Sequence, residues 1–342
     1  MKISFIIPAY NAEKTIIRCL DSIYSIFFNN DDFEVIVIDD CSTDNTIDVV
    51  NLYLQNKKNL LLLCQPFNNK QGAARNRGVR IAKGEFICFV DSDDAIDKGI
   101  LSSISLAEKK HLEMVAMHFE SLDVSGNVIN NFSINLSGDI VLSGIEFQNN
   151  FPYWCSGPCG YLYRKSFIQQ VAYPFFEGVF YEDADFVIVH LYRAKRIAYS
   201  SDLAYLAYYN DISTTHVLTP QRNADYFLCG ARIFSVYQSL LAENSEVIDK
   251  KVIDFEKSLL EGACYNISKS IKQLFKHQST IDVDLFYSRI DSFLDINDII
   301  KYRKVCGLYW KVYMTIAIKY RLLTKIFVSI YLSYKHLKKY LT

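Results

Sequence analysis

No apolar run in the sequence approaches the roughly 18 uninterrupted residues that a membrane-spanning helix needs. Charge of one sign is not in excess either, because 37 Lys and Arg face 38 Asp and Glu and the formal net charge is -1. A chain so balanced is not globally basic, and we expect no nucleic-acid partner. The apolar stretch 3–7 is too short for a signal peptide and meets Pro8 at once, which favours a cytoplasmic protein.

Spaced cysteine pairs and glycine-rich phosphate loops are also missing. The nine cysteines are scattered, most of them inside apolar segments, and none forms a pair at zinc-ribbon or redox spacing. This usage is typical of reduced core residues, and the spacer between Cys155 and Cys159 favours a turn over a bridge. No G-x-G-x-x-G follows the first apolar stretch and no P-loop lysine motif occurs, which argues against both kinds of nucleotide-binding domain.

What the sequence does contain is a regular alternation of short apolar stretches with helical patterns. With 342 residues, of which 50% are hydrophobic and 22% charged, the chain can bury a large core, and we expect two domains. Strands that alternate with helices predict a parallel, doubly wound α/β sheet. The predicted strands are 2–7, 33–38, 60–64, 86–90, 114–119, 195–201 and 203–209, and one of the predicted helices covers 71–82.

The alternation stops at about residue 220, and helical periodicity follows. We therefore expect an α/β domain over 1–218 and a helical region over 219–342. Between 299 and 342 the chain has ten Lys or Arg and no acidic residue, interleaved with aromatic residues. Basic and aromatic residues on amphipathic helices fit a peripheral anchor on the anionic inner face of a membrane. The alternative is a helix that packs on the α/β domain and keeps its lysines in water.

The most unusual cluster follows the predicted strand 86–90, which ends in Asp91, Asp93 and Asp94. Carboxylates so close together repel one another and lose hydration when covered, so they favour a bound cation. An acid-any-acid spacing suits a hard divalent ion whose shell is completed by phosphate oxygens. The alternative is a solvated turn in which Asp94 or Asp97 caps the next helix.

Two further polar clusters end the first two predicted strands, at 8–11 and 39–44. In doubly wound sheets ligands lie beyond the carboxyl ends of the strands, and every unusual polar cluster of this half lies at such an end. The sequence therefore predicts a ligand site at this edge. For the second cluster the alternative is turn chemistry, with Ser42 or Thr43 capping the following helix.

Charged side chains elsewhere are candidates for the same ligand. Asp40 could accept a hydrogen bond from a nucleotide base, and Lys70 and Arg75 could contact its phosphates. Glu182 and Asp183 open a predicted helix, where unpaired amide groups stabilise carboxylates as anions. Acidic helix starts are also common without any function, which is the alternative for this pair.

Four segments, in this order, look like the successive signatures of family-2 glycosyltransferases with the GT-A fold. They are SFIIPAYN at 4–11, VIDDCSTD at 37–44, GAARNRG at 72–78 and FVDSDD at 89–94. The resemblance implies a Rossmann-like, doubly wound, mixed and mostly parallel sheet of the nucleotide-diphospho-sugar transferase superfamily. It also implies an inverting hexosyltransferase that moves a sugar from an NDP-sugar to an acceptor hydroxyl. Cys41 stands where the family often has glycine.

The resemblance also implies roles for individual residues. Asp93, together with Asp91, would hold the divalent metal, Mn or Mg, of the DxD motif. Asp183 would be the general base that takes the proton of the acceptor hydroxyl, and Glu182 would orient the acceptor. The residues that would bind the donor are Pro8, Tyr10, Asn11, Asp40, Lys70, Arg75 and Asp91.

Later segments carry weaker matches. Tyr153 and Trp154 fall where the family lines the sugar, and either aromatic could stack on a sugar face or pack in the core. His216 lies in a segment that resembles the loop over the diphosphate, where it would add a metal ligand; exposed loop histidines usually bind nothing. Residues 121–150 contain turn signals, which predict a hairpin or a flap near the acceptor side.

The partners implied by the resemblance are an NDP-sugar, which we expect to be a UDP-sugar, and a glycan or lipid-linked acceptor. Assembly of a bacterial surface polysaccharide or glycolipid fits these partners, and a lipid-linked acceptor would give the basic tail a purpose.

Two other functions compete with this hypothesis. A nucleotidyltransferase would use an acidic metal site on the same kind of sheet, but it would usually show a glycine-rich, basic loop after the first strand, and segment 8–11 is not one. A non-catalytic sugar-nucleotide or membrane-docking module would keep the fold without the chemistry. The joint presence of Asp91, Asp93 and Asp183 argues against such a module.

Overall fold

The computed structural model describes residues 1–292 apart from 28, 30, 56, 153, 154, 156, 210–218, 244–248, 278 and 279. The chain forms two compact units, Met1–Asp211 and Ile212–Thr342. The basic tail predicted from residue 299 lies outside the described residues. The predicted domain boundary at 218 falls in the segment 210–218 and stays a prediction.

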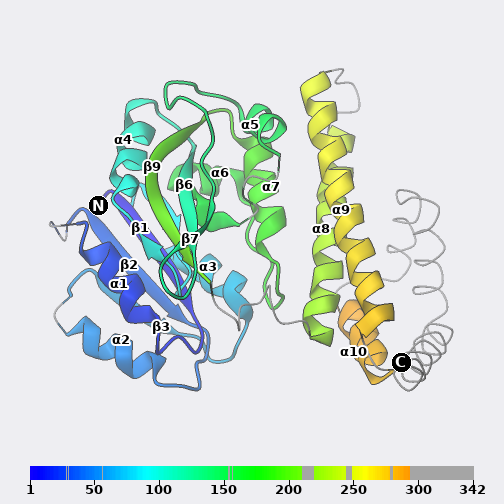
Figure 1. The fold of residues 1–342 in the computed structure, drawn as a ribbon, viewed down its shortest axis with the longest axis horizontal. Coiled ribbons are helices and arrows are strands. Elements are labelled where there is room, and N and C mark those ends of the chain that lie inside the picture. Colours follow the sequence, from blue (N-terminus) through cyan, green and yellow to red (C-terminus); the bar gives the residue numbers. More distant parts are fainter. Residues whose placement is uncertain are drawn as a thin grey trace. The chain divides into compact units, whose positions relative to one another are not determined.

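Figure 1 labels most of the helices and strands of the two units. The first unit consists of β1 (Ile3–Ala9), α1 (Ile16–Tyr24), β2 (Phe33–Asp39), α2 (Thr46–Leu54), β3 (Leu60–Cys64), α3 (Lys70–Ile81), β4 (Phe86–Phe89), β5 (Ala95–Ile96), α4 (Gly99–Lys109), β6 (Met114–Leu122), β7 (Val128–Asn131), α5 (Gly144–Asn150), the 3-10 helix η1 (Pro158–Gly160), β8 (Tyr161–Arg164), α6 (Lys165–Val171), α7 (Asp183–Arg193) and β9 (Ile197–Tyr208). The second contains α8 (Pro220–Glu243), α9 (Lys250–His277) and α10 (Thr280–Asp291).

The central strands are buried along their whole length. Every residue of β1, β2 and β4 is buried, as expected of parallel strands that helices cover on both faces. Two polar residues among them pair with each other, because Ser4 Oγ donates to Glu34 Oε1 at 2.6 Å from one strand to the next. Continuous apolar runs are what such strands require, and this is why the sequence predicts them well.

One strand prediction was wrong. Residues 195–201 and 203–209, predicted as two strands, form the single strand β9. Its parallel pairing with β6 shifts register, because Met117 faces Ser200 whereas His118 faces Leu203. The extra residues between those partners form an irregularity within β9 and not a turn, so the polar pair at 201–202 does not end the strand.

The strand order places a switch point between β1 and β4. The sheet runs β3-β2-β1-β4-β8-β6-β9-β5, and β7 pairs with β6. The pairs β1–β2, β2–β3 and β1–β4 are parallel. The chain therefore steps outward from β1 to β3 and then crosses back to β4 on the other side of β1. Ligands of doubly wound sheets bind at the carboxyl ends of strands at such a reversal.

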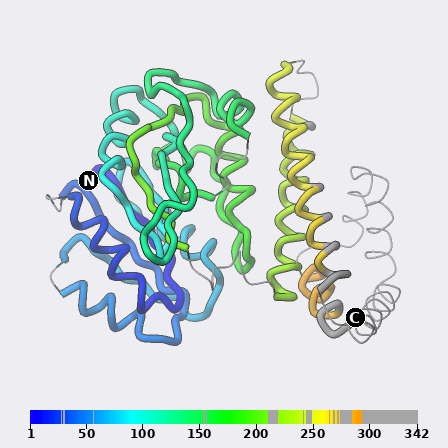
Figure 2. The backbone as a smooth tube through the Cα atoms, viewed as in Figure 1, coloured from blue at the N-terminus to red at the C-terminus, as the bar shows by residue number. Residues whose placement is uncertain are grey.

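A small extension of the sheet stands beside the end of β4. Strand β8 is antiparallel to both β4 and β6, and Leu162 pairs with Cys88 of one and Val115 of the other. Cys88 and Val115 therefore lie at the same height in the sheet. Strand β6 continues beyond this height to Leu122, whereas β4 ends at Phe89. Strand β9 pairs with β6 along its whole length, β7 pairs with the far end of β6, and β9 pairs with β5. Figure 2 traces the course of the backbone through each unit. The hairpin predicted within 121–150 is present as β6–β7.

Two predicted helix caps are absent. Helix α2 begins at Thr46 after Asn45, which makes no side-chain cap, and neither Ser42 nor Thr43 caps it. Helix α4 follows Lys98, again without a side-chain cap. The candidate caps were wrong because these side chains have other partners: Ser42 and Thr43 bond Asn11, Asp94 bonds Tyr205 and Tyr208, and Asp97 bonds the Lys98 N–H.

The second unit is helical, as predicted. A Cβ at Gly230 of α8 would lie 2.8 Å from Ile267 Cγ1, so glycine allows α9 to approach closely. Asp225 of α8 is fully buried and accepts two hydrogen bonds from Arg289 of α10, at 2.8 and 3.1 Å. Over the described residues, no helix combines the length and the apolar character needed to cross a membrane.

Candidate active site

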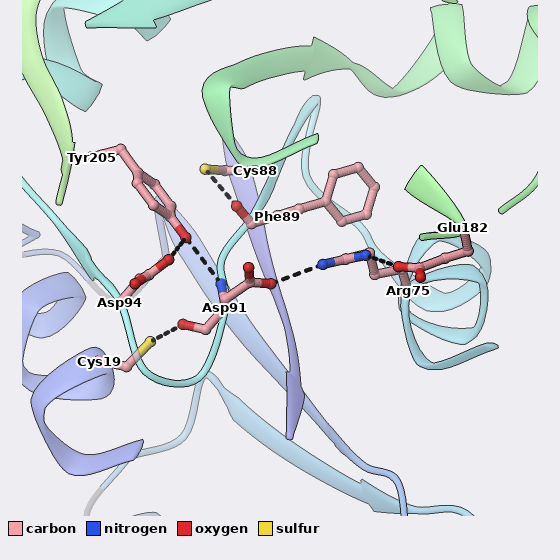
Figure 3. Close-up of polar contacts among 8 residues, drawn as sticks. All are labelled: Cys19, Arg75, Cys88, Phe89, Asp91, Asp94, Glu182 and Tyr205. Carbon is pink, nitrogen blue, oxygen red and sulfur yellow. Dashed lines mark hydrogen bonds and ion pairs between the residues drawn. The ribbon is translucent and has the colours of Figure 1, made fainter. Parts of the chain in front are cut away.

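Arg75 joins two carboxylates that are far apart in the sequence. From α3 it donates to Asp91 Oδ1 at 2.8 Å and to Glu182 Oε1 at 2.5 Å (Figure 3). The side chains of Arg75 and Glu182 are 4% and 1% exposed, whereas that of Asp91 is 42% exposed. The guanidinium therefore ties the acidic turn after β4 to the start of α7 and leaves Asp91 accessible to solvent.

Helix α3 is shaped to reach the segment before α7. A Cβ at Gly72 would lie 2.5 Å from the carbonyl oxygen of Phe176 and 2.9 Å from Glu182 Cγ, a distance that only glycine permits. Asn76 Nδ2 donates to the carbonyl oxygen of Phe175 at 2.9 Å, and the Phe175 N–H donates back to Asn76 Oδ1 at 2.9 Å. The motif GAARNRG is thus the clamp that positions α7 against the acidic turn.

Tyr205 of β9 holds the acidic turn in shape. Its hydroxyl donates to Asp94 Oδ2 at 2.6 Å and accepts from the Asp91 N–H at 3.2 Å (Figure 3). Asp94 also accepts from the Tyr208 N–H at 2.9 Å. Burial raises the pKa of Asp94 well above its usual value, and the nearby carboxylates of Asp91 and Asp93 raise it further. Asp94 is therefore a buried structural residue of the turn, while Asp91 and Asp93 are its partly exposed members.

The loops after β1 and β2 are joined by hydrogen bonds. Asn11 Oδ1 accepts from the Thr43 N–H at 2.8 Å, and the Asn11 N–H donates to Ser42 Oγ at 2.9 Å. Asn11 and Cys41 have φ angles of 51° and 65°, in the left-handed region that favours glycine. The glycine that the family often has in place of Cys41 would relieve this backbone strain.

Asp40 organises the loop after β3. Its Oδ1 accepts from Gln65 Nε2 at 2.7 Å and from the Asn69 N–H at 2.8 Å. Burial raises the pKa of Asp40, and the hydrogen bonds from Asn69 and Lys70 oppose that rise. Asn69 also accepts from the Gly178 N–H at 2.9 Å, in the segment before α7. One residue therefore links Asp40 to the segment that leads into Asp183.

Glu182 and Asp183 lie at the start of α7. The residue before them, Tyr181, has a φ of 58°, so the backbone turns sharply into the helix. Burial raises the pKa of both carboxyls, and the positive charge of Arg75 opposes the rise. Asp183 is partly exposed, and a raised pKa makes its carboxylate a better proton acceptor. The raised pKa also means that the pair costs folding energy, a feature common at functional sites.

His190, two turns further along α7, is neutral and packed. Its Nδ1 donates to the carbonyl oxygen of Phe186 at 2.8 Å, and its ring lies 4.0 Å from that of Phe186. The Nε2 atom is buried and has no hydrogen-bond partner in the part of the chain that the structure describes. Burial lowers the pKa of His190 to about 4. His190 is therefore a packing residue of α7, and we assign it no role in the chemistry at the carboxyl ends of the strands.

The carboxylates of the acidic turn fit a divalent ion only in part. Asp91 and Asp93 supply the hard oxygen donors that Mg and Mn prefer. Across the described residues, no three His, Cys, Asp or Glu side chains are placed to hold a metal ion. An ion held here would therefore complete its coordination with oxygens of a bound ligand, such as a diphosphate.

The structure brings most of the predicted site residues to one edge. Those at or beside the carboxyl ends of β1 to β4 and the start of α7 are Pro8, Tyr10, Asn11, Asp40, Lys70, Arg75, Asp91, Asp93, Glu182 and Asp183. Three predicted residues, Tyr153, Trp154 and His216, lie outside the described residues, and their roles stay predictions. The sequence analysis missed Tyr205, which lies in an ordinary apolar strand and carries no motif that could reveal it.

Comparisons with known proteins relate the chain to glycosyltransferases. The model of the family described as glycosyl transferase family 2 matches residues 4–152. Poly(ribitol-phosphate) beta-glucosyltransferase of Bacillus spizizenii is 32% identical over 209 residues, which are 60% of this chain and 32% of that protein. The chain thus spans about a third of the length of this curated relative.

Two solved structures are similar in fold. TarS 1-349 of Staphylococcus aureus, solved in complex with UDP-GlcNAc, has a TM-score of 0.66 at 22% identity and covers 98% of this chain and 92% of its own. A mannosyltransferase of Pyrobaculum calidifontis, solved with GDP-Man and Mn2+, has a TM-score of 0.50 at 14% identity and covers 94% of this chain and 87% of its own. The predicted GT-A fold with an appended helical region is confirmed.

Proposed function

Residues 4–152 belong to glycosyl transferase family 2, and on this premise we propose that the chain is an inverting, metal-dependent glycosyltransferase. It moves a sugar from an NDP-sugar, in our proposal a UDP-sugar, to an acceptor hydroxyl. The process that it serves is the assembly of a surface polysaccharide or a glycolipid. The solved complex of TarS with UDP-GlcNAc supports a uridine donor.

The observation that carries the proposal is the double ion pair of Arg75. Because one buried guanidinium contacts both Asp91 and Glu182, the acidic turn and the start of α7 form a single arrangement of carboxylates. Glu182 is next to Asp183 in the chain, so a candidate base stands beside a candidate diphosphate site. Inverting transfer needs this pairing of a base and a leaving-group site around one anomeric carbon.

The reaction follows from these positions. Asp183 accepts the proton of the acceptor hydroxyl while the acceptor oxygen bonds to the anomeric carbon. The bond from that carbon to the diphosphate oxygen breaks, and the diphosphate leaves with the electron pair, so the configuration inverts. Asp91 and Asp93 would hold a divalent ion, which when bound supplies positive charge to the leaving diphosphate. The Mn2+ in the mannosyltransferase complex supports such an ion.

The other site residues have binding or positioning roles in this proposal. Asp40 with the 8–11 turn faces the nucleoside, and Lys70 faces the diphosphate. Arg75 acts differently from the simple phosphate contact predicted from the sequence, because both ends of its guanidinium already bind carboxylates. We infer that it positions Asp91 and Glu182.

The location of the protein is a further part of the proposal. The basic, aromatic residues between 299 and 342 would hold the chain against the inner face of the membrane, where lipid-linked acceptors are assembled. No nucleic-acid partner is proposed, because the net charge of -1 gives no electrostatic drive for one.

Thermal denaturation with nucleotide sugars tests the donor site, because a ligand that binds the native state raises its melting temperature. We expect UDP-sugars with manganese to raise the melting temperature of the native chain. Asp93→Ala should remove most of the manganese-dependent part of the rise. The matched control is Asp97→Ala, since the Asp97 side chain bonds the neighbouring Lys98 N–H and should not affect the ligand.

Two results would contradict the proposal. One is a native chain whose melting temperature no nucleotide sugar changes, with or without manganese. The other is product formation from a nucleoside triphosphate and a sugar phosphate but not from a labelled NDP-sugar, which would indicate a nucleotidyltransferase.

A further inference from the structure

The part of the first unit that faces an acceptor is nearly without cations. Between residues 111 and 192 the sequence has two Lys or Arg, which are Arg164 and Lys165, and nine Asp or Glu. This stretch includes the β6–β7 hairpin, the 155–160 turn and the start of α7. The stretch therefore offers an acceptor few positive charges of its own.

Both cations lie at the opposite edge of the sheet. Arg164 pairs with Phe86 at the start of β4, whereas the site is at the end of that strand. Its guanidinium donates to the carbonyl oxygen of Leu112 at 2.8 Å. Lys165 Nζ donates to the carbonyl oxygen of Ala82 at 2.7 Å. Neither side chain is available to an acceptor that reaches Asp183.

A chain of contacts connects Asp183 to the β6–β7 hairpin. A Cβ at Gly157 would lie 3.7 Å from Asp183 Oδ2, and Cys155 Sγ donates to the carbonyl oxygen of Gly157 at 3.3 Å. A Cβ at Gly160 would lie 2.6 Å from Cys155 Sγ and 3.7 Å from Phe119 Cε1. Phe119 belongs to the extended end of β6. The hairpin is therefore the next surface that an acceptor meets beyond the 155–160 turn.

The hairpin surface carries apolar, amide and hydroxyl groups. Val124, Val128 and Ile129 are 82%, 52% and 49% exposed, and Phe132 stacks on Phe119 with 4.2 Å between ring centroids. Residues 121–137 include four asparagines and four serines but no Lys or Arg. Apolar side chains and aromatic rings can pack on the C–H faces of sugars, and amides and hydroxyls can bond their hydroxyl groups. Phosphate recognition instead relies on Arg and Lys.

We propose that the acceptor is an uncharged glycan that lies over the β6–β7 hairpin. This inference rests on the proposed glycosyltransferase function and names the chemical class of its acceptor. It separates the chain from the Bacillus spizizenii relative, whose name specifies a poly(ribitol-phosphate). A polyanion placed along 111–192 would meet no Lys or Arg of that stretch, and Arg18, which stacks on Tyr208 beside Leu122 of β6, already donates to the carbonyl oxygen of Asp93.

Acceptor competition with the full chain tests the class. We expect transfer from a UDP-sugar to neutral oligosaccharides, with a KM that does not change between about 0.05 and 0.3 M salt, because neutral contacts are not screened. Poly(ribitol phosphate) should accept sugar no faster than water does.

Salt-sensitive transfer to poly(ribitol phosphate) would overturn the inference, since it would mean that cations elsewhere in the chain bind a polyanion. Donor hydrolysis without transfer to any neutral acceptor would also overturn it. Absence of donor binding would instead contradict the proposed function.

Charge placed on the hairpin tests the surface. Val128→Lys with Ile129→Lys should raise the KM for the neutral acceptor about tenfold, a loss of about 1.4 kcal/mol of binding, and should leave the KM for the donor unchanged. Val128→Ser with Ile129→Ser, which adds no charge, should act in the same direction and serves if the lysine pair does not fold. The control is Leu52→Lys on α2, a residue that is 68% exposed and lies near the β3 edge. Equal acceptor KM values in all three variants and the native chain would place the acceptor elsewhere.

Discussion

Two segments of the first unit, residues 1–110 and residues 111–209, meet at one edge of the sheet. They differ in the number and the position of their Lys and Arg residues. The first segment contains thirteen Lys or Arg, and two of them contact the acidic turn: Arg18 donates to the carbonyl oxygen of Asp93, and Arg75 donates to Asp91 Oδ1. The second contains five, and those within 111–192 lie at the opposite edge. Diphosphate chemistry needs paired charges, whereas a neutral acceptor needs none. Several side-chain contacts join the two segments at this edge, among them Arg75 with Glu182 and Tyr205 with Asp94.

The largest effect is expected at the contact of Arg75 with Glu182, where residues 1–110 meet residues 111–209. Arg75→Met leaves the buried Glu182 without its cation, and breaking a buried ion pair from one side costs about 3–5 kcal/mol. We expect the free energy of unfolding, measured by urea denaturation, to fall by this amount. Arg80→Met is the control, because Arg80 is on the same helix but exposed. Equal losses for the two variants would mean that Arg75 does not hold the segments together.

The stability of residues 111–209 should be sensitive to acid through His190. Its pKa is lowered to about 4 from its usual 6.5, so between these values the unfolded chain binds a proton that the folded chain does not. The contribution of His190 to the free energy of unfolding is therefore fully present above pH 6.5. It is lost as the pH falls toward 4, at a slope of about 1.4 kcal/mol per pH unit.

The measurement for His190 is the slope of unfolding free energy against pH. His190→Leu should be less stable at pH 7 or nearly unchanged, but its slope between pH 6.5 and 4 should be smaller by about 1.4 kcal/mol per unit. Because the slope is independent of any constant loss of packing energy, equal slopes in the two proteins would show that His190 titrates normally.

A smaller effect is expected at Tyr205, through which residues 111–209 hold the acidic turn after β4 in shape. Tyr205→Phe removes the donor to Asp94 and the acceptor for the Asp91 N–H, a loss of about 1–2 kcal/mol for buried hydrogen bonds. The KM for the UDP-sugar in manganese should rise as the turn loosens. Tyr53→Phe is matched, since the Tyr53 hydroxyl bonds Asp21 in an exposed setting. Equal changes of the KM in both variants would mean that the hydrogen bonds of Tyr205 do not determine the shape of the acidic turn.

The smallest effect concerns backbone strain. Of the six non-glycine residues with positive φ in the described part of the chain, four lie in the loops of this edge, and Cys41 is one of them. Cys41→Gly should stabilise the chain by about 1 kcal/mol, because glycine adopts φ of 65° without strain. Cys64→Gly, in strand β3, should destabilise it instead. Calorimetric melting temperatures that move in the same direction for both would contradict this account.

The sequence predicts the buried strands and the edge of the sheet where the site lies, but it does not predict the side-chain partners within the site. Buried parallel strands require continuous apolar runs, so β1, β2 and β4 can be found from composition alone, and the polar residues that follow them mark the edge. The partners of Arg75 cannot be found that way, because Glu182 reaches it through the approach that Gly72 permits. The failed caps at Ser42 and Thr43 have the same cause: both bond Asn11, a contact that exists only once β1 and β2 are side by side.

The central claim is that Asp183 is the base of a site whose donor half is built by other residues. The most direct test is Asp183→Asn, with donor binding measured by calorimetry and transfer measured by product formation. The account predicts a donor affinity within about twofold of the native chain and a loss of transfer of at least about a hundredfold, the range in which general-base catalysis contributes. Full turnover in Asp183→Asn would contradict it.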